Sequence, residues 1–256
     1  MARFLRFQCP DGIFYGTMEG EELIHPISGD MFSDHTVSDK TYELKNVKLL
    51  PPCEPSKLLA IGFNYMDHAI EFKREIPKAP NIFIKPNSSL AAQGDHVIYP
   101  KFHTHQVEYE SELVIVIGKE ARNVDEAEAM DYVFGFTIGN DVTARDMQSP
   151  TNQWGLCKGF DTFAPIGPWI ETDTDGSDLD ISSYVNGQLK QHSNTKNLIF
   201  NVPFLVSYIS KGMTLHPGDV IFTGTPAGVS PVFPGDTMEM RIEKIGSLIN
   251  EVKAEE

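Results

Sequence analysis

Residues 107–119 read VEYESELVIVIGK, and this stretch decides the predicted fold. Glu108, Glu110 and Glu112 recur at every second residue, and a run of Leu, Val and Ile follows them at once. Because successive side chains of a β-strand point to opposite faces, the pattern predicts a strand whose three carboxylates share one face. The following run is apolar on both faces, which indicates that this part of the strand is buried. The sequence therefore predicts three carboxylates at the start of a strand that continues into the protein core.

Three interpretations of this acidic strand stay open from the residues alone. An edge strand can use charge to prevent aggregation. Alternatively, a bound cation removes the repulsion between carboxylates, which grows as water is excluded. Carboxylate oxygens favour hard ions such as Mg²⁺, Mn²⁺ or Ca²⁺ over Zn²⁺. The third interpretation is a carboxylate pair of the glycosidase type, although such pairs usually face each other across a cleft.

Strand patterns dominate the rest of the chain. The first fifty residues alternate short apolar runs with turns, as small antiparallel strands do. Asn186-Gly187 predicts a tight hairpin, and the last third of the chain alternates strand-like runs with Gly/Pro turns. We therefore expect a mixed, strand-rich α+β fold resembling a sandwich or barrel. The stretch Pro51–Lys57 breaks the pattern, so we expect a small N-terminal β domain over 1–50 and a main domain over 51–256.

Helix signals are few. Asp125 and Glu128 have the spacing of a capping box, which predicts a helix that continues towards Val133. Asn201 is a candidate N-cap, and Gly212 suits the end of the same helix. We find neither the GxGxxG nor the P-loop pattern, which disfavours a nucleotide-binding fold.

Composition narrows the class of protein. The net charge of −15 argues against nucleic acid or an anionic membrane as a partner, since both require a basic face. No segment approaches the ~20 apolar residues of a membrane span. The hydrophobic content of 41% is sufficient for a proper core. Cys9, Cys53 and Cys157 are odd in number and widely spaced, which suits a reducing cytoplasm rather than a disulfide framework.

Two further clusters contain chemically useful residues. Asp141 follows a strand-like run in FGFTIGNDVTARDMQ (134–148), where it is either a ligand or an ordinary turn residue, and Arg145 can pair locally with Asp146. His68 and Glu71 in GFNYMDHAIEFKRE are spaced i, i+3, so on a helix they share one face. A carboxylate on an imidazole raises the basicity that a general base requires. The alternative is a surface contact.

Taken together, these motifs resemble the fumarylacetoacetate hydrolase family from about Lys57 to Val252. The motifs are IGFNYMDHAIE, FIKP, YESELVIVIGK, DVTARDMQ, QWGLCKGFDTFAPIGPWI and VIFTGTPAGV. The first fifty residues are similar to the small N-terminal β domain of some bacterial members. The resemblance implies a mixed β-roll core and a homodimer. It also implies one divalent cation per chain, Mg²⁺ or Mn²⁺ with Ca²⁺ as an option, held by Glu110, Glu112 and Asp141. Glu108 lies just outside the motif.

The resemblance also implies roles for residues around the metal. The family's water-activating dyad corresponds to His68 and Glu71, on a stretch that can order as a lid. The family's catalytic lysine corresponds to Lys158. The substrate-binding positions expected by the same comparison are Gln148, Thr225, Lys85 and Arg145. Phe63 stands where some members have Arg and Gly159 where many have Ser, and both departures affect the identity of the substrate.

These parts predict a metal-dependent enzyme that acts on a 2-oxo acid through an enolate. The complete His68–Glu71 pair favours hydrolysis of a C–C bond in an acylpyruvate-like or fumarylacetoacetate-like substrate. The alternatives are an isomerase, tautomerase or decarboxylase, acting on oxaloacetate or a 2-hydroxyhepta-2,4-diene-1,7-dioate type of substrate, and a ureidoglycolate-type lyase. A metal-dependent ligand-binding module without turnover is the non-enzymatic alternative.

Overall fold

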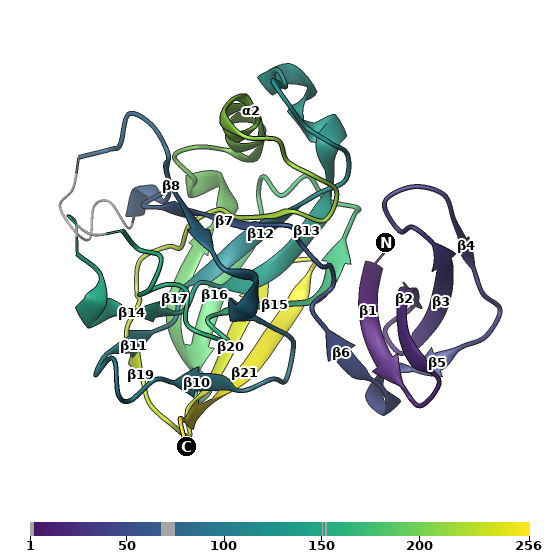
Figure 1. Cartoon of the computed structure of the whole chain (residues 1–256), viewed down its shortest axis with the longest axis horizontal. Coiled ribbons are helices and arrows are strands. Elements are labelled where there is room, and N and C mark those ends of the chain that lie inside the picture. The colour runs from purple at the N-terminus through teal and green to yellow at the C-terminus, as the bar shows by residue number, and fades with distance from the viewer. Residues whose placement is uncertain (1–2, 68–74, 150, 152) are drawn as a thin grey trace.

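The computed structural model of the chain describes residues 3–67, 75–149, 151 and 153–256. The predicted pair His68 and Glu71 therefore lies outside the described residues. Figure 1 shows a strand-rich molecule, with the N-terminal strands grouped at one side of a larger body. The predicted α+β class, with mixed sheets and few helices, is confirmed.

The largest sheet runs through the whole molecule and has thirteen strands within the described residues. Its strands are β1 (Arg3–Cys9), β2 (Gly12–Glu19), β3 (Leu23–Gly29), β4 (His35–Val37), β5 (Tyr42–Glu43), β6 (Lys48–Leu50), β7 (Leu58–Gly62), β8 (Asn81–Lys85), β9 (Leu90–Ala91), β12 (Ser111–Ile117), β13 (Val133–Asn140), β15 (Ala164–Glu171) and β18 (Val220–Phe222). The main path is β4-β3-β2-β1-β15-β13-β12-β18-β7-β8. Most neighbouring strands are antiparallel. Strands β7 and β18 are parallel, so the residues that follow each of them lie at the same end of the strands.

Two smaller sheets complete the described strands. A five-stranded sheet has the order β10-β21-β20-β16-β17, and a three-stranded sheet has the order β14-β11-β19. Their bounds are β10 (Val97–Tyr99), β11 (Val107–Glu108), β14 (Thr143–Ala144), β16 (Asp180–Val185), β17 (Gln188–Asn194), β19 (Pro231–Val232), β20 (Thr237–Ile242) and β21 (Gly246–Ala254). Leu113 and Ile115 of β12 share one buried cluster with Met240 and Leu248 of the five-stranded sheet, so the core lies between the two sheets.

The predicted hairpin and one predicted helix are confirmed. Asn186 and Gly187 join β16 to β17 with φ of 51° and 75°, as a tight turn of this type requires. Helix α2 (Val202–Gly212) begins after Asn201, whose side chain accepts a hydrogen bond from the Phe204 N–H at 3.0 Å. None of the described helices is long and apolar enough to span a membrane.

The other predicted helix is only a 3₁₀ segment. The Asp125 side chain makes no capping hydrogen bond, and the helix η3 (Glu126–Tyr132) stops before Val133, which begins β13. The predicted start after Asp125 matches, but the capping hydrogen bond does not form, and Val133 pairs with Ile117 in the sheet instead of continuing the helix. The remaining short helices are η1 (Leu44–Asn46), η2 (Asn87–Ser89), η4 (Arg145–Met147) and η5 (Thr195–Asn197).

The acidic stretch is not one continuous strand. Glu108 ends β11, and β12 begins only at Ser111, so the chain changes sheets between them. Every residue of β12 is buried, and the strand lies between β13 and β18. The interpretation as a charged edge strand is therefore wrong for Glu112, which lies on an interior strand.

The stretch Pro51–Lys57 is fastened to the main body by one buried carboxylate. Asp219, just before β18, accepts hydrogen bonds from the Ser56 N–H at 2.9 Å and the Ser56 hydroxyl at 2.6 Å. It also accepts from the backbone N–H groups of Lys57 and His216 at 3.1 and 2.7 Å, and it pairs with the Lys57 ammonium. All its neighbours are donors, so this carboxylate is structural.

Asn64 joins three segments that are distant in sequence. Its amide donates to the carbonyls of Thr223 at 2.7 Å and Phe200 at 3.0 Å, and its side-chain oxygen accepts from the Phe200 N–H at 2.7 Å. Its own carbonyl accepts from the Ile199 N–H at 2.8 Å. Because Asn64 is fully buried, these bonds fix the segment after β7 against the loop before α2 and the end of β18.

Candidate metal centre and active site

Three predicted metal ligands converge in the structure. Carboxylate oxygens of Glu110, Glu112 and Asp141, hereafter the acidic cluster, all lie within 4.8 Å of one another, and all three residues are buried. Among the described residues they form the only such group of His, Cys, Asp or Glu side chains. Glu112 extends from β12, whereas Asp141 directly follows β13, its antiparallel neighbour.

Backbone hydrogen bonds hold the cluster in place. The Glu110 N–H donates to the side-chain oxygen of Asn140, and the Asp141 N–H donates to the Glu110 carbonyl, both at 2.9 Å. The Gly224 N–H donates to Glu112 Oε2 at 2.7 Å. The φ of 98° at Gly224 is in the left-handed region, and a side chain there would also collide with Asn64. Three chain segments therefore determine where the carboxylates meet.

Cations approach two members of the cluster closely. Lys158 Nζ lies 2.7 Å from Glu110 Oε2 and 2.6 Å from Asp141 Oδ2, so it bridges them. The Lys85 ammonium contacts the other oxygen of Asp141. Burial alone would lower the pKa of Lys158, but the charges of Asp141 and Glu110 outweigh burial and raise it. Lys158 is therefore a charged donor inside the site.

Arg145 connects the cluster to its rim. Its guanidinium donates to Glu108 Oε2 at 2.6 Å, and it also contacts Glu110 and the side-chain oxygen of Gln148. The predicted pairing with Asp146 does not form, because Asp146 accepts instead from Thr104 and the His105 N–H. Glu108 thus serves Arg145 and stays outside the acidic cluster.

Glu110 and Glu112 differ although they are two residues apart. Burial would raise the pKa of Glu110, but Lys158 and Arg145 outweigh it and lower the pKa to about 2. Burial, followed by repulsion from Asp141 and Glu110, raises the pKa of Glu112 well above its usual value. A divalent cation would relieve that repulsion, and three carboxylates are the oxygen donors that hard cations prefer. The residues present therefore fit a hard divalent ion.

A small cavity adjoins the cluster. It measures about 20 Å³, enough for one water-sized group. Besides the acidic cluster, Arg145, Gln148 and Thr225, its lining includes Ile61, Gly62, Phe63 and Trp154. The sequence prediction did not include Trp154, although the residue lies in a motif that was singled out. None of the lining residues comes from the N-terminal strands β1–β6.

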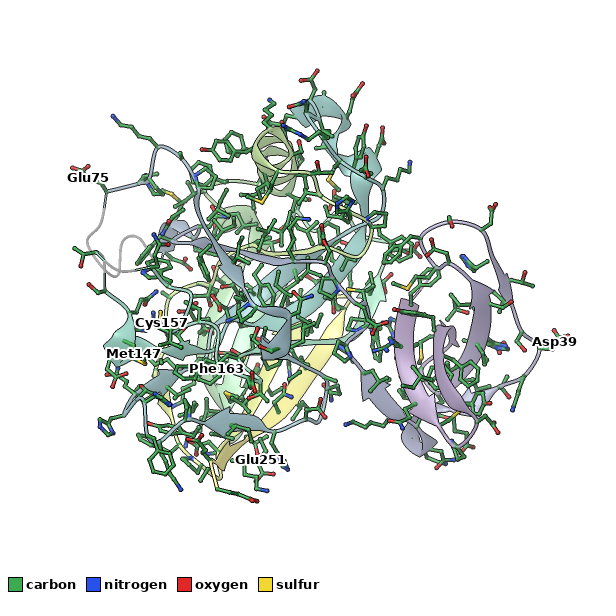
Figure 2. All side chains as sticks on the ribbon, in the orientation of Figure 1. Asp39, Glu75, Met147, Cys157, Phe163 and Glu251 are labelled. Atoms are coloured by element: carbon green, nitrogen blue, oxygen red, sulfur yellow. The ribbon has the colours of Figure 1, made fainter. Side chains whose placement is uncertain are left out.

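Of the predicted substrate-binding residues, some line the cavity and one is buried behind it. Gln148 and Thr225 line the cavity, and the Thr225 hydroxyl is fixed between the Ser111 carbonyl at 2.9 Å and the Gln191 amide at 2.8 Å. Lys85 is fully buried behind Asp141, where burial lowers its pKa and the charge of Lys158 adds to that effect. Met147, Cys157 and Phe163 are close in sequence to Gln148 and Lys158. Figure 2 labels these three residues on the side of the molecule away from the N-terminal strands.

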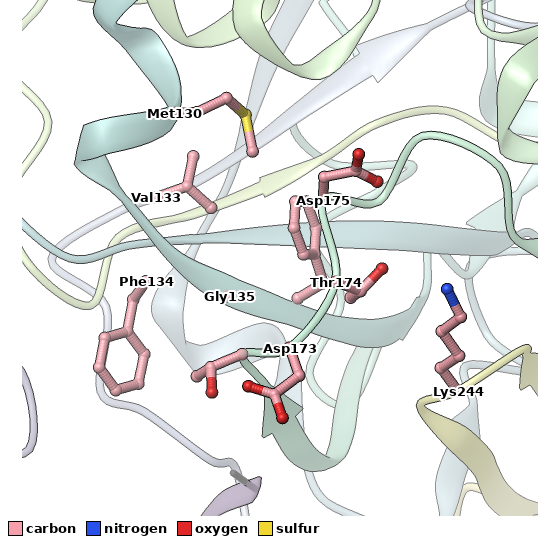
Figure 3. Close-up of a pocket in the computed structure, with 10 residues that line it drawn as sticks. Met130, Val133, Phe134, Gly135, Asp173, Thr174, Asp175 and Lys244 are labelled. Atoms are coloured by element: carbon pink, nitrogen blue, oxygen red, sulfur yellow. The ribbon is translucent and has the colours of Figure 1, made fainter. Parts of the chain in front are cut away.

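A larger hollow lies elsewhere. It measures about 480 Å³ and is lined in part by Asp173, Asp175 and Lys244, and Figure 3 shows Lys244 at the right of the view and the two aspartates nearer its middle. Its acidic side chains form no group with metal-ligand spacing. Chemistry, rather than volume, therefore selects the smaller cavity as the candidate site.

Comparisons with known proteins show the family of the chain. The family model described as "Fumarylacetoacetate (FAA) hydrolase C-terminal" matches residues 57–253, and a second one, described as "Rv2993c-like, N-terminal", matches residues 2–52. Oxaloacetate tautomerase fahd2 of Xenopus laevis is 43% identical, over 81% of this chain and 69% of that protein.

Two solved structures are similar over the full length. The 2-hydroxyhepta-2,4-diene-1,7-dioate isomerase of Mycobacterium marinum has a TM-score of 0.93 and 40% identity, and the match covers 100% of this chain and 99% of that one. The fumarylacetoacetate hydrolase of Exiguobacterium antarcticum has a TM-score of 0.90 and 33% identity, and the match covers 100% of both chains. With its strand-rich fold, its three converging carboxylates and these matches, the chain belongs to the fumarylacetoacetate hydrolase family of enzymes.

Proposed function

We propose that this protein uses one Mg²⁺ or Mn²⁺ ion to catalyse enolate chemistry on a short 2-oxo acid, with keto–enol tautomerisation of an oxaloacetate-type substrate as the first candidate. The observation that carries the proposal is the acidic cluster together with the Lys158 ammonium, which contacts both Glu110 and Asp141. The named tautomerase and isomerase relatives support proton transfer.

Each residue has a role in this proposal. Glu110, Glu112 and Asp141 would hold the ion, which would supply Lewis-acid chemistry for a 2-oxo acid. Lys158 supplies a positive donor for the oxyanion of the enolate. Arg145 fixes Glu110 and orients Gln148. Gln148 and Thr225 offer an amide and a hydroxyl to the substrate, and Lys85 holds Asp141.

The proton is moved by the predicted dyad. In this proposal His68, oriented by Glu71, removes a proton from the carbon next to the keto group or returns it there. Both residues lie outside the described part of the chain, so their roles rest on the sequence. Replacement His68→Ala is expected to abolish turnover and to leave the affinity for Mn²⁺ unchanged.

Hydrolysis of a C–C bond is the second candidate. The same dyad would then activate a water molecule that attacks the β-carbonyl of an acylpyruvate, and the pyruvate part would leave as the enolate. The hydrolase neighbour from Exiguobacterium antarcticum supports this candidate. Decarboxylation of oxaloacetate would produce an equivalent enolate by loss of CO₂.

One assay separates these reactions. Mn²⁺-loaded protein is mixed with enol-oxaloacetate, keto-oxaloacetate and acetylpyruvate, and the disappearance of the enol, release of CO₂ and formation of pyruvate are followed in parallel. Metal-dependent loss of the enol without CO₂ or pyruvate supports the tautomerase. Cleavage of acetylpyruvate as the faster reaction would replace it by the hydrolase. Tight Mn²⁺ binding with no turnover would favour a ligand-binding module.

Three wider expectations belong to the same proposal. We propose two domains, over 1–50 and 51–256, a homodimeric assembly and a cytoplasmic location. Light scattering after size exclusion tests the dimer. The absence of a cavity-lining residue from β1–β6 supports a role for the first domain outside the substrate pocket.

A further inference from the structure

The cavity beside the acidic cluster has two unlike walls. One wall consists of carboxylates, Arg145 and polar groups, and the other consists of Ile61, Gly62, Phe63 and Trp154. The acidic wall selects the ion and the acid end of a substrate. An acid end held at the acidic wall would direct the rest of the substrate carbon chain towards the second wall, whose position would then limit the length of that chain.

Trp154 is fixed on several sides. Its ring meets that of Phe83 edge-on at 5.3 Å between centroids and that of Phe63 at 6.2 Å. Its indole N–H donates to the Ser149 carbonyl at 3.2 Å. Together these contacts hold the indole in one orientation, so it forms a rigid wall rather than an adaptable one.

The same turn also fixes the catalytic lysine. The Lys158 N–H donates to the Trp154 carbonyl at 3.1 Å, and Lys158 Nζ lies 5.3 Å from the centroid of the Phe83 ring. The indole and the ammonium are therefore held at a set separation by one turn and one shared aromatic neighbour.

Gly62 is the position that allows the indole to lie so close. A Cβ atom at residue 62 would lie 2.6 Å from Trp154 Cζ3 and 2.9 Å from Cη2, nearer than non-bonded carbons approach. Gly62 ends β7 with φ outside the left-handed region, so the glycine is needed for this contact rather than for the backbone conformation. The two indole carbons are the nearest atoms, and Asn81 Nδ2 follows at 3.1 Å.

We propose that Trp154, seated on Gly62, is a specificity-determining residue that limits the substrate to short-chain 2-oxo acids. This inference rests on the proposed function, since it assumes that a 2-oxo acid binds at the acidic cluster. The indole excludes longer chains by occupying their space, and it takes no part in metal binding.

Isothermal titration of Mn²⁺-loaded protein with 2-oxobutanoate, 2-oxohexanoate and 2-oxooctanoate tests the proposal. In the unmodified protein we expect affinity to fall at least 10-fold from the shortest to the longest acid. In Trp154→Ala the three affinities should lie within about 3-fold, and Trp154→Phe should give an intermediate profile. The affinity of each variant for Mn²⁺ alone should match that of the unmodified protein, which shows that the site is folded.

A double substitution tests whether the contact between Gly62 and the Trp154 indole determines binding. Gly62→Ala should weaken binding of 2-oxobutanoate at least 5-fold when Trp154 is present and less than about 2-fold in the Trp154→Ala background, where only Asn81 Nδ2 would lie close to the new Cβ. The matched control is Trp169→Phe, since the only other tryptophan lies against Arg3 at the junction with the N-terminal strands, and its length profile should be unchanged.

The outcomes separate the two proposals. An identical length profile in the unmodified protein and Trp154→Ala, or an equal effect of Gly62→Ala in both backgrounds, would overturn the role of Trp154 alone. If Mn²⁺ binds but no 2-oxo acid of any length does, the proposed function fails and the role of Trp154 fails with it.

Discussion

Two buried carboxylate sites in this protein are surrounded in opposite ways. Asp219 accepts from three backbone N–H groups, one hydroxyl and one ammonium. Glu112 accepts from the Gly224 N–H, and two further carboxylates face it. Burial raises the pKa of both groups, but the donors lower the pKa of Asp219 overall, whereas repulsion raises that of Glu112 further. Donors therefore stabilise the charge of Asp219, whereas the repulsion at Glu112 is the feature that a bound cation would relieve.

The largest effect is expected for Glu112→Gln. The variant should lose Mn²⁺ affinity by about 100-fold or more, because even substitutions behind a ligand cost about 10–100-fold. Activity should fall about a thousandfold, equivalent to about 4 kcal/mol. In EDTA the variant should be at least as stable as the unmodified protein, since a repelled buried carboxylate has been neutralised. Mn²⁺ titration and urea unfolding measure both quantities.

Glu108→Gln is the matched control, because Glu108 contacts Arg145 and the Gln106 amide but lies outside the acidic cluster. Its Mn²⁺ affinity should change by less than about threefold. If Glu108→Gln and Glu112→Gln lost Mn²⁺ affinity equally, the assignment of Glu112 as a ligand and Glu108 as a residue outside the cluster would be wrong.

Asp219→Asn should show the reverse pattern. An asparagine keeps one acceptor oxygen for Ser56 and the Lys57 N–H, but it leaves the Lys57 ammonium and the His216 N–H facing an NH₂ group, so the free energy of unfolding should fall by about 3 kcal/mol. Mn²⁺ affinity should stay within about twofold. A stable variant with weakened metal binding would contradict the structural role of Asp219.

The unfolding free energies of the unmodified protein and of Asp219→Asn should depend differently on pH. Because folding lowers the pKa of Asp219, its stabilisation is complete above the unfolded pKa of about 3.9 and is lost as pH falls through the lower folded pKa. The gap in unfolding free energy between the unmodified protein and Asp219→Asn should therefore stay constant from about pH 8 to pH 5 and narrow below about pH 4. Urea unfolding across this range checks it. If the difference in unfolding free energy increased below about pH 4, folding would raise rather than lower the pKa of Asp219.

The smallest effect is expected for Arg145→Lys. A lysine keeps the charge but cannot contact Glu108, Glu110 and Gln148 with three nitrogens at once. We expect kcat/KM to fall about 10-fold, or about 1.4 kcal/mol, with Mn²⁺ affinity nearly unchanged. A loss of metal affinity as large as that of Glu112→Gln would place Arg145 among the groups that build the metal site.

The resemblance to the fumarylacetoacetate hydrolase family supplied Glu110, Glu112 and Asp141 as candidate ligands, whereas the residues alone left the acidic strand and Asp141 open; the three carboxylates converge in the structure. The two-residue period predicted one strand with Glu108, Glu110 and Glu112 on one face. The chain instead changes sheets between Glu108 and Ser111, so Glu110 belongs to neither strand. The partner of Arg145 was also missed, since Glu108 and Glu110 come from another segment of the chain. Trp154 could not be placed by any local pattern, because its position depends on Gly62 and Phe83.

The bonds of Asn64 have a consequence for local unfolding. One side chain bonds both the loop before α2 and the end of β18, so neither can open without exposing the other's polar groups to water. The amide hydrogens of Ile199 and Phe200, although they belong to a loop, should therefore exchange with solvent as slowly as those of the central strands.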